Sequence, residues 1–163
     1  MYTLNMKKKV FEVLDGAGIK YRCIEHEPVY TVADVGRYFP DKYPVKNLLL
    51  KEEKGERCVF VVMNGDERLD TKQLAKSLGC KKLQFAKPEI LMSKLGVEPG
   101  SASLFSLIHE GSKGLEVVID QRLLEQPEIG FHPSLNTETI MIDGQYIPTF
   151  LEYLGVEFKF LAQ

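Results

Sequence analysis

The stretch VKNLLLKEEKGERCVFVVMN, residues 45–64, decides the fold. It contains two runs rich in leucine, valine and phenylalanine, which are separated by a polar segment around Lys54 and Gly55. Apolar runs of this length that are joined by a short glycine-containing turn are typical of a β-hairpin. We therefore expect paired strands at 45–53 and 56–64.

The segments on either side of this hairpin mix helical and strand patterns. Helices are expected at 4–16, at 31–39 with Thr31 as N-cap, at 70–79, at 87–96 and at 143–155. Strands are expected at 21–26, at 114–120, at 156–160, after the turn in EPGSASLFSLI (98–108), and on both sides of the loop in IGFHPSLNTETIMI (129–142). Helices and strands do not follow a regular βαβ order. This favours a single α+β domain over residues 1–163, with a mixed, mostly antiparallel sheet, rather than a doubly wound fold.

The composition limits the classes of function. The formal net charge of −2 gives no general attraction to polyanions, so any contact with nucleic acid must use a local patch. The lysines available for such a patch are Lys7, Lys8, Lys9, Lys81 and Lys82. Three widely spaced cysteines without a C-x-x-C pair favour a reducing compartment, and we expect a soluble cytoplasmic protein. The three histidines have no ligand spacing, so no metal is expected, and the sequence has no P-loop or G-x-G-x-x-G motif for a nucleotide cofactor.

A lysine and an asparagine interrupt the first strand of the hairpin. Because side chains alternate along a strand, Lys46 shares one face with Leu48 and Leu50. A lysine beside leucines indicates either the edge of a cleft or an ordinary solvated side chain, and the pattern alone leaves both interpretations open.

Two short loops are further candidates. In EPGSASLF (98–105) the Pro99–Gly100 turn is followed by Ser101 and Ser103, so amides and hydroxyls could converge on an anion, or the segment could be a plain β-turn. In GFHPSLNT (130–137) a proline biases the backbone of His132 away from the helical region. Gly130 allows a close approach to the backbone there. From these residues alone, the loop could be a functional site or only a rigid connection between the two strands of a hairpin.

These motifs together resemble one family. EHEPVYTVAD, VKNLLLK, GVEPGSASLF and GFHPSLNT occur in the order found in free-standing aminoacyl-tRNA deacylases of the YbaK/ProX type, which are related to the editing insertion domain of bacterial prolyl-tRNA synthetases. The GFHP loop is most similar to the PrdX/ProX branch, which hydrolyses alanine mischarged on tRNA(Pro). The resemblance implies an α+β fold with a mixed, partly barrel-like sheet.

The resemblance also implies a reaction and a site. The expected reaction is the deacylation of Ala-tRNA(Pro) without a cofactor, together with a transient association with prolyl-tRNA synthetase. The alternatives are a Cys-tRNA(Pro) deacylase and a non-catalytic tRNA-binding module. The expected catalytic residues are Lys46, Asn47, Gly130 and His132, and the expected substrate-binding residues are Gly100, Ser101, Ser103, Phe131, Pro133, Asn136 and Leu48. One departure is Ser134, where many relatives carry a leucine.

Overall fold

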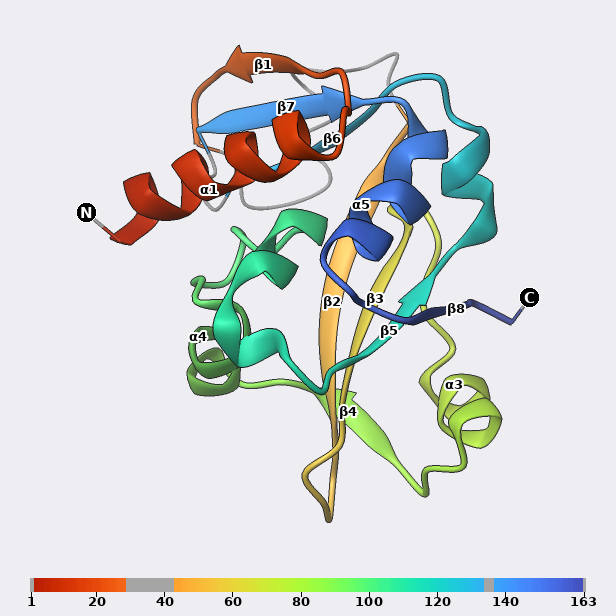
Figure 1. The fold of residues 1–163 in the computed structure, drawn as a ribbon. Helices are drawn as coiled ribbons and strands as arrows, with labels where there is room; N and C mark the ends of the chain where they lie inside the picture. The colour runs from red at the N-terminus through yellow and green to blue at the C-terminus, as the bar shows by residue number, and fades with distance from the viewer. Residues whose placement is uncertain (1, 29–42, 134–136, 163) are drawn as a thin grey trace.

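The computed structural model describes residues 2–28, 43–133 and 137–162, and within them two sheets lie one above the other (Figure 1). The upper sheet has the strand order β1-β7-β6, with bounds Arg22–Glu25, Glu138–Ile142 and Ile129–Phe131. The lower sheet has the order β4-β2-β3-β5-β8, with bounds Leu83–Phe85, Val45–Glu52, Cys58–Asn64, Glu116–Ile119 and Phe158–Phe160. We call them the small sheet and the large sheet.

The hairpin predicted at 45–64 forms the centre of the large sheet. β2 and β3 are antiparallel, and their register pairs Lys46 with Met63 and Lys51 with Cys58. β3 then pairs with β5 in parallel, and β5 pairs with β8 in parallel. The mixed sheet and the α+β class are therefore confirmed. The two sheets are separate rather than parts of one closed barrel, so the barrel-like description does not apply to the described strands.

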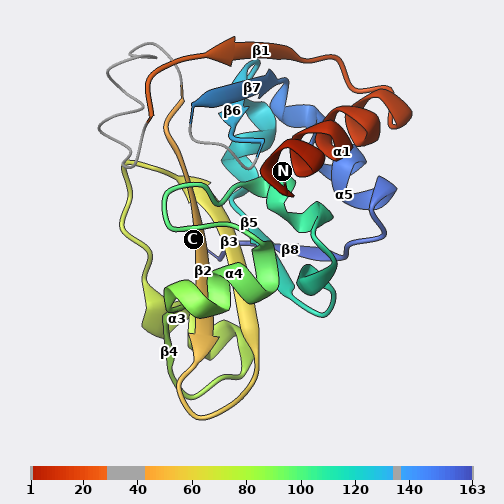
Figure 2. The same ribbon diagram turned by 90° about the vertical axis from the view of Figure 1, so that its left-hand side faces the viewer.

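Side-chain alternation gives the large sheet two buried faces. Leu49, Phe60 and Val62 belong to the main hydrophobic core, which also includes residues of α1, α5 and the small sheet. Leu50 and Val61 point the other way, into a second cluster beneath α3. Figure 2 shows β2 running from the small sheet toward the far tip of the hairpin. The residues at the start of β2 therefore lie where the two sheets meet.

The helices follow the capping signals in the sequence. Their bounds are α1 Tyr2–Gly16, α3 Thr71–Leu78, α4 Pro88–Leu95 and α5 Ile147–Tyr153. The Asp70 carboxylate accepts a hydrogen bond from the Gln73 amide at 3.0 Å, and Gly79 ends α3 in the left-handed conformation. Pro88 opens α4, as predicted. No helix among the described residues is long and apolar enough to cross a membrane.

Several expectations need correction. The strand expected after the 98–101 turn is a 3-10 helix, η1, at Leu104–Ile108, and three further 3-10 turns occur at Glu110–Ser112 (η2), Gln121–Glu125 (η3) and Gly144–Tyr146 (η4). Strand β4 was not predicted, because only three residues form it and pairing with β2 holds it in place. The helix expected at 31–39, with its cap at Thr31, lies outside the described residues.

Candidate functional site

The small sheet presents one face to the main core and a second face that carries polar groups. Phe131 lies in the main core, whereas alternation places Gly130 and His132 on the second face. A Cβ atom at Gly130 would lie 2.6 Å from Thr139 Cγ2 and 2.7 Å from Met141 Sδ. Gly130 is thus required by the packing of β7 side chains across the ladder, which is a close approach to the backbone of the kind that the sequence predicted. We call this surface the histidine face.

His132 is held in one tautomer. Its Nδ1 lies 2.9 Å from the main-chain carbonyl of Glu138, which can only accept, so Nδ1 carries the hydrogen. Burial lowers the pKa of His132 below its ordinary value; the Glu138 carbonyl opposes this shift and the nearby His26 adds to it. The imidazole is therefore neutral near pH 7, with Nε2 as a hydrogen-bond acceptor. Among the described residues, Nε2 has no hydrogen-bond partner.

A second histidine reaches the same face from the end of β1. The His26 and His132 rings lie 6.1 Å apart between centroids, at an interplanar angle of 55°. His26 Nε2 lies 2.7 Å from Thr139 Oγ1. We did not predict His26 or Thr139 as site residues. The EHE of EHEPVYTVAD was the available signal, but nothing in the sequence pairs it with a loop more than a hundred residues later.

Ser103 connects the 98–105 loop to the histidine face. Its hydroxyl donates to the main-chain carbonyl of His132 and accepts from the Phe105 amide at 3.1 Å. The Ser103 amide donates to Ser106 Oγ at 3.0 Å, which completes a capping box at the start of η1. We had expected Ser103 to face a ligand, but its side chain is completely buried and supports the His132 loop.

The turn before Ser103 was predicted correctly. Gly100 has a φ of 91°, and the Ser101 amide donates to the Glu98 carbonyl at 3.1 Å. The amides of Ser101 and Ser103 are thus already used within the loop. Among the described hydrogen bonds, none engages the amide of Gly100 or Ala102, so these two donors remain for a ligand.

Asn47 and Lys46 lie on opposite faces of β2. Asn47 shares the face of Leu49, toward the main core, and β2 contacts β6 there. The Asn47 Oδ1 atom is buried and has no hydrogen-bond partner among the described residues, which is a costly state for an amide oxygen. Lys46 lies on the other face with Met63, and it contributes to lowering the pKa of Glu67, after the larger effect of Arg122.

The apolar residues expected to line a substrate pocket do not meet. Phe131 is 2% exposed inside the main core and packs edge-on against Phe105, whereas Leu48 packs against the second cluster. They lie on different sides of the large sheet and cannot form one pocket wall. Pro133 is buried beside His132. Asn136 lies outside the described residues.

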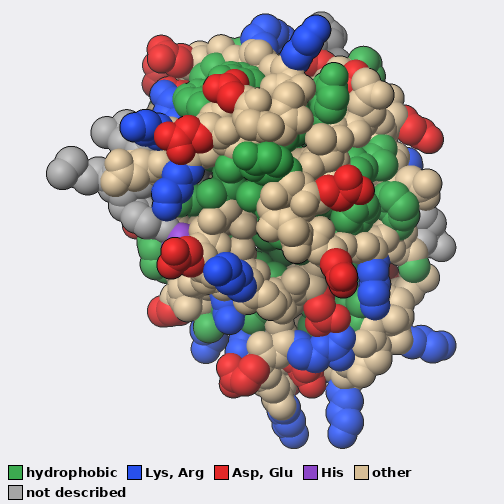
Figure 3. Space-filling model, viewed as in Figure 1, with side chains coloured by type: hydrophobic (Ala, Val, Ile, Leu, Met, Phe, Trp, Pro, Cys, Tyr) green, Lys and Arg blue, Asp and Glu red, His purple; other side chains and the backbone are tan. Residues whose placement is uncertain are grey.

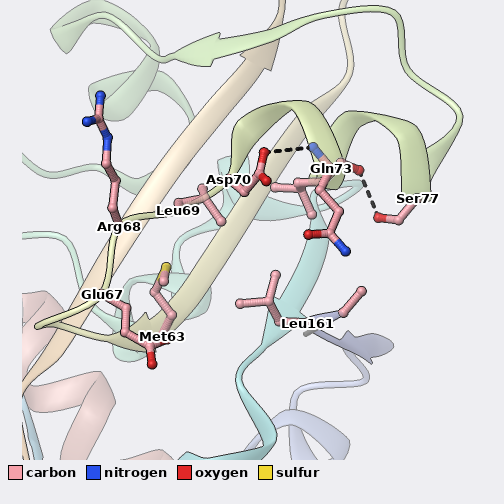
Figure 4. A pocket seen from close by; sticks show the side chains of 10 residues that line it. Met63, Glu67, Arg68, Leu69, Asp70, Gln73, Ser77 and Leu161 are labelled. Atoms are coloured by element: carbon pink, nitrogen blue, oxygen red, sulfur yellow. Dashed lines mark hydrogen bonds between the residues drawn. The ribbon is translucent and has the colours of Figure 1, made fainter.

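A cavity of about 130 Å³ lies between α3 and the C-terminal segment (Figure 4). Its floor is apolar and includes Met63, Leu69 and Leu161. Its carboxylates have structural partners, since Asp70 caps α3 and Glu67 pairs with Arg122. This cavity is on the Lys46 side of the sheet and is separate from the histidine face.

The cysteines offer no activated nucleophile. All three are free, and burial raises the pKa of each thiol, in Cys23, Cys58 and Cys80. Within the described part of the chain, no group of three or more histidine, cysteine or acidic side chains is placed to hold a metal ion. The histidine face can therefore activate or orient water through an imidazole, but it supplies no thiolate.

Two of the lysines considered for nucleic-acid contact form ion pairs with carboxylates. Lys7 pairs with Glu138 at 2.6 Å, and Lys82 pairs with Glu53 at 3.2 Å. Figure 3 shows basic and acidic side chains interspersed over the visible face, with several lysines and arginines protruding at its lower end.

Comparison with known proteins gives the family. Residues 26–150 match the model of the aminoacyl-tRNA editing domain. The chain belongs to this family. It is 31% identical over 158 residues to the prolyl-tRNA editing protein ProX of Acetoanaerobium sticklandii, with 96% of each chain covered. It is 29% identical to the prolyl-tRNA synthetase associated domain-containing protein 1 of Danio rerio, with 91% of this chain and 83% of that protein covered.

Solved structures agree with the fold of this editing domain. The structure of a proposed trans-editing enzyme for prolyl-tRNA synthetase superimposes with a TM-score of 0.73 at 20% identity, with 97% of each chain covered. A second structure, of a protein described as hypothetical, gives a TM-score of 0.76 at 19% identity, with 95% and 99% covered. The family model and the identity to ProX confirm the YbaK/ProX resemblance.

Proposed function

We propose that this editing domain hydrolyses the ester between alanine and the 3′-terminal adenosine of tRNA(Pro). Family membership and the identity to a prolyl-tRNA editing protein over 96% of the chain support an aminoacyl-tRNA deacylase that acts on mischarged tRNA(Pro). We propose alanine as the amino acid because its side chain is smaller than that of proline. A synthetase pocket built for proline rejects a smaller side chain weakly, because each lost methylene is worth only about 1–3 kcal/mol.

The observation that carries the proposal is the state of His132. Its Nδ1–H is used by the Glu138 carbonyl, and burial favours the neutral ring. Nε2 can therefore accept a hydrogen bond from the attacking water or from the vicinal ribose hydroxyl. An aminoacyl ester is already activated, so orienting water and stabilising the tetrahedral oxyanion suffices. The free amides of Gly100 and Ala102 are our candidates for that stabilisation.

Asn47 and Lys46 take complementary roles in this proposal. The buried Asn47 Oδ1 gains the partner it lacks when it accepts a hydrogen bond from the α-ammonium group of the aminoacyl ester. Lys46, on the opposite face of β2, acts as a point charge for a phosphate near the 3′ end. Strand β4 pairs with β2 only at Leu50–Glu52, so an extended 3′ end can pass the start of β2 without displacing β4.

The test is deacylation of tRNA(Pro) charged with alanine, cysteine, serine or proline. The parent should release alanine fastest, and His132→Gln should lose about a hundredfold or more in kcat/KM. Asn47→Ala should raise KM, and Lys46→Ala should weaken tRNA binding more at low salt than at high salt. His109→Gln is the matched control, since this histidine contacts Gly111, away from the small sheet.

Each outcome has a distinct meaning. Absence of alanine release above the uncatalysed rate, with tRNA still bound, would make the chain a non-catalytic binding module. Faster release of cysteine would overturn the alanine assignment. An unimpaired His132→Gln variant would overturn the site while leaving the function intact. Repeating the assay with prolyl-tRNA synthetase tests the expected transient association.

A further inference from the structure

We propose that His26 is a positioning residue for His132 and that it acts through Thr139. This inference rests on the proposed hydrolytic function, in which His132 Nε2 faces the reacting groups. It adds a residue from the end of β1, far from His132 in the sequence, to the set that determines the rate.

The His26 ring has a fixed position and a fixed tautomer. The His26 amide donates to the Thr137 carbonyl at 2.9 Å, which extends the β1–β7 ladder by one residue. Nδ1 lies 2.7 Å from the Glu27 carbonyl, an acceptor, so Nδ1 carries the hydrogen. In the neutral ring Nε2 then accepts from the Thr139 hydroxyl at 2.7 Å.

Thr139 transmits this contact to the strand of His132. Thr139 is 4% exposed, so without His26 its hydroxyl would lose the partner at Nε2 while remaining buried. The bond also selects the rotamer, because Oγ1 and Cγ2 of a threonine rotate together about one stiff torsion. In that rotamer Cγ2 lies against Gly130, two residues before His132. The hydrogen bond of the Thr139 hydroxyl thus determines which atom of Thr139 packs against Gly130 in β6.

The electrostatic surroundings single out His26. Glu138 of β7 offers only its carbonyl to His132, since its carboxylate lies on the opposite face with Lys7 of α1 and the Cys23 thiol of β1. Among the described residues, His26 is therefore the titratable side chain that faces His132, at 6.1 Å between ring centroids. Burial is the main cause of the lowered pKa of His132, and the neighbouring His26 lowers this pKa further, which helps to keep His132 neutral.

Four variants test the inference: His26→Phe, His26→Gln, Thr139→Val and Thr139→Ser. Phenylalanine keeps a planar ring without nitrogen, and glutamine keeps an acceptor. Valine keeps the shape of threonine without the hydroxyl, and serine keeps the hydroxyl. Two readouts are needed, namely the pH profile of kcat and KM on Ala-tRNA(Pro) and the titration of the His132 ring followed by NMR. Thermal unfolding of each variant shows that it is folded.

We expect His26→Phe and Thr139→Val to lose about tenfold to a hundredfold in kcat with KM nearly unchanged. His26→Gln should retain most of kcat, and Thr139→Ser, which keeps the hydroxyl but lacks Cγ2, should retain more of kcat than Thr139→Val. Both His26 variants should move the His132 titration, and the acid limb of the rate profile, to higher pH. Parental kcat in His26→Phe and Thr139→Val, or an unmoved His132 titration in His26→Phe, would overturn the inference.

The failure of this inference is distinguishable from failure of the proposed function. The NMR titration needs no turnover. If the parent releases no alanine while the His132 titration still moves in His26→Phe, the proposed function fails and the coupling of the two histidines stands. If the parent is active and all four variants match it, the function stands and the positioning role of His26 is wrong.

Discussion

The Ser103 hydroxyl donates a hydrogen bond to the main-chain carbonyl of His132, and this bond joins two loops that lie 29 residues apart. Ser103 is also the N-cap of η1, so one buried side chain holds both the start of the 3-10 helix and the loop that carries the histidine. The position of His132 therefore depends on a serine that cannot touch a substrate.

Replacing this serine should be costly. Ser103→Ala removes a cap and leaves the His132 carbonyl without its partner, which together should lower the free energy of unfolding by about 2 kcal/mol. Urea denaturation measures the change. Ser101→Ala is the matched control for stability, since Ser101 is only partly buried, and it should change stability by less than about 0.5 kcal/mol. Equal losses in the free energy of unfolding for Ser103→Ala and Ser101→Ala would contradict a stabilising role for the hydrogen bond between Ser103 and His132.

A side chain at position 130 should lower the free energy of unfolding. In Gly130→Ala the new methyl group would overlap Thr139 Cγ2 and Met141 Sδ, and we expect a loss of about 1–3 kcal/mol in the free energy of unfolding. Thr139→Ser removes one of the two overlapping groups, so the double variant should lose less than the sum of the single variants. A double-mutant cycle by urea denaturation tests this, and simple additivity would argue against the overlap.

Stability should depend on pH through His132. The unfolded chain binds a proton near pH 6.5, whereas burial lowers the pKa of His132 in the folded protein. The stabilising contribution of the neutral ring is therefore complete above about pH 6.5 and decreases as the pH falls toward the folded-state pKa. The difference in free energy of unfolding between the parent and His132→Gln should shrink between about pH 7 and pH 5. A difference that stays constant over this range would contradict the lowered pKa.

A buried carboxylate should make Arg122 important for stability. Asp120 is fully buried; burial alone would raise its pKa, but hydrogen bonds from Arg122 and from the Asn64 amide lower it. Arg122→Gln leaves this charge poorly compensated and should cost up to about 3 kcal/mol. Arg22→Gln is the control, because the Arg22–Glu128 ion pair is largely exposed and should contribute less than about 1 kcal/mol. Urea denaturation gives the free energy of unfolding of both variants, and equal losses would contradict the larger role of Arg122.

Local signals in the sequence predicted much of the fold. The hairpin at 45–64, the cap at Asp70, the left-handed Gly79 and the opening proline of α4 are set by neighbouring residues, and each has a known physical basis. The segment after Ser103 misled us because LFSLI is almost wholly apolar, as in a strand. Ser103 and Ser106, spaced as in a capping box, were the overlooked signal for η1.

The site was harder to predict because it depends on which way side chains point across long separations. Alternation placed Lys46 with Leu48 and Leu50 correctly, but the second core cluster beneath α3 could not be foreseen from that pattern. The contact between His26 and His132 requires the β1–β7 and β6–β7 pairings together. The β6–β7 pairing joins the two strands expected on either side of the 130–137 loop, but the β1–β7 pairing has no local sequence signal.

The order of strands in the large sheet has a consequence for how the chain is made. β3 is buried from Cys58 to Met63, yet its parallel partner β5 is synthesised much later, and β8 later still. A nascent chain therefore carries an unshielded apolar hairpin until those strands emerge, and closing these distant contacts is slow. We therefore expect chaperones to bind this hairpin during translation.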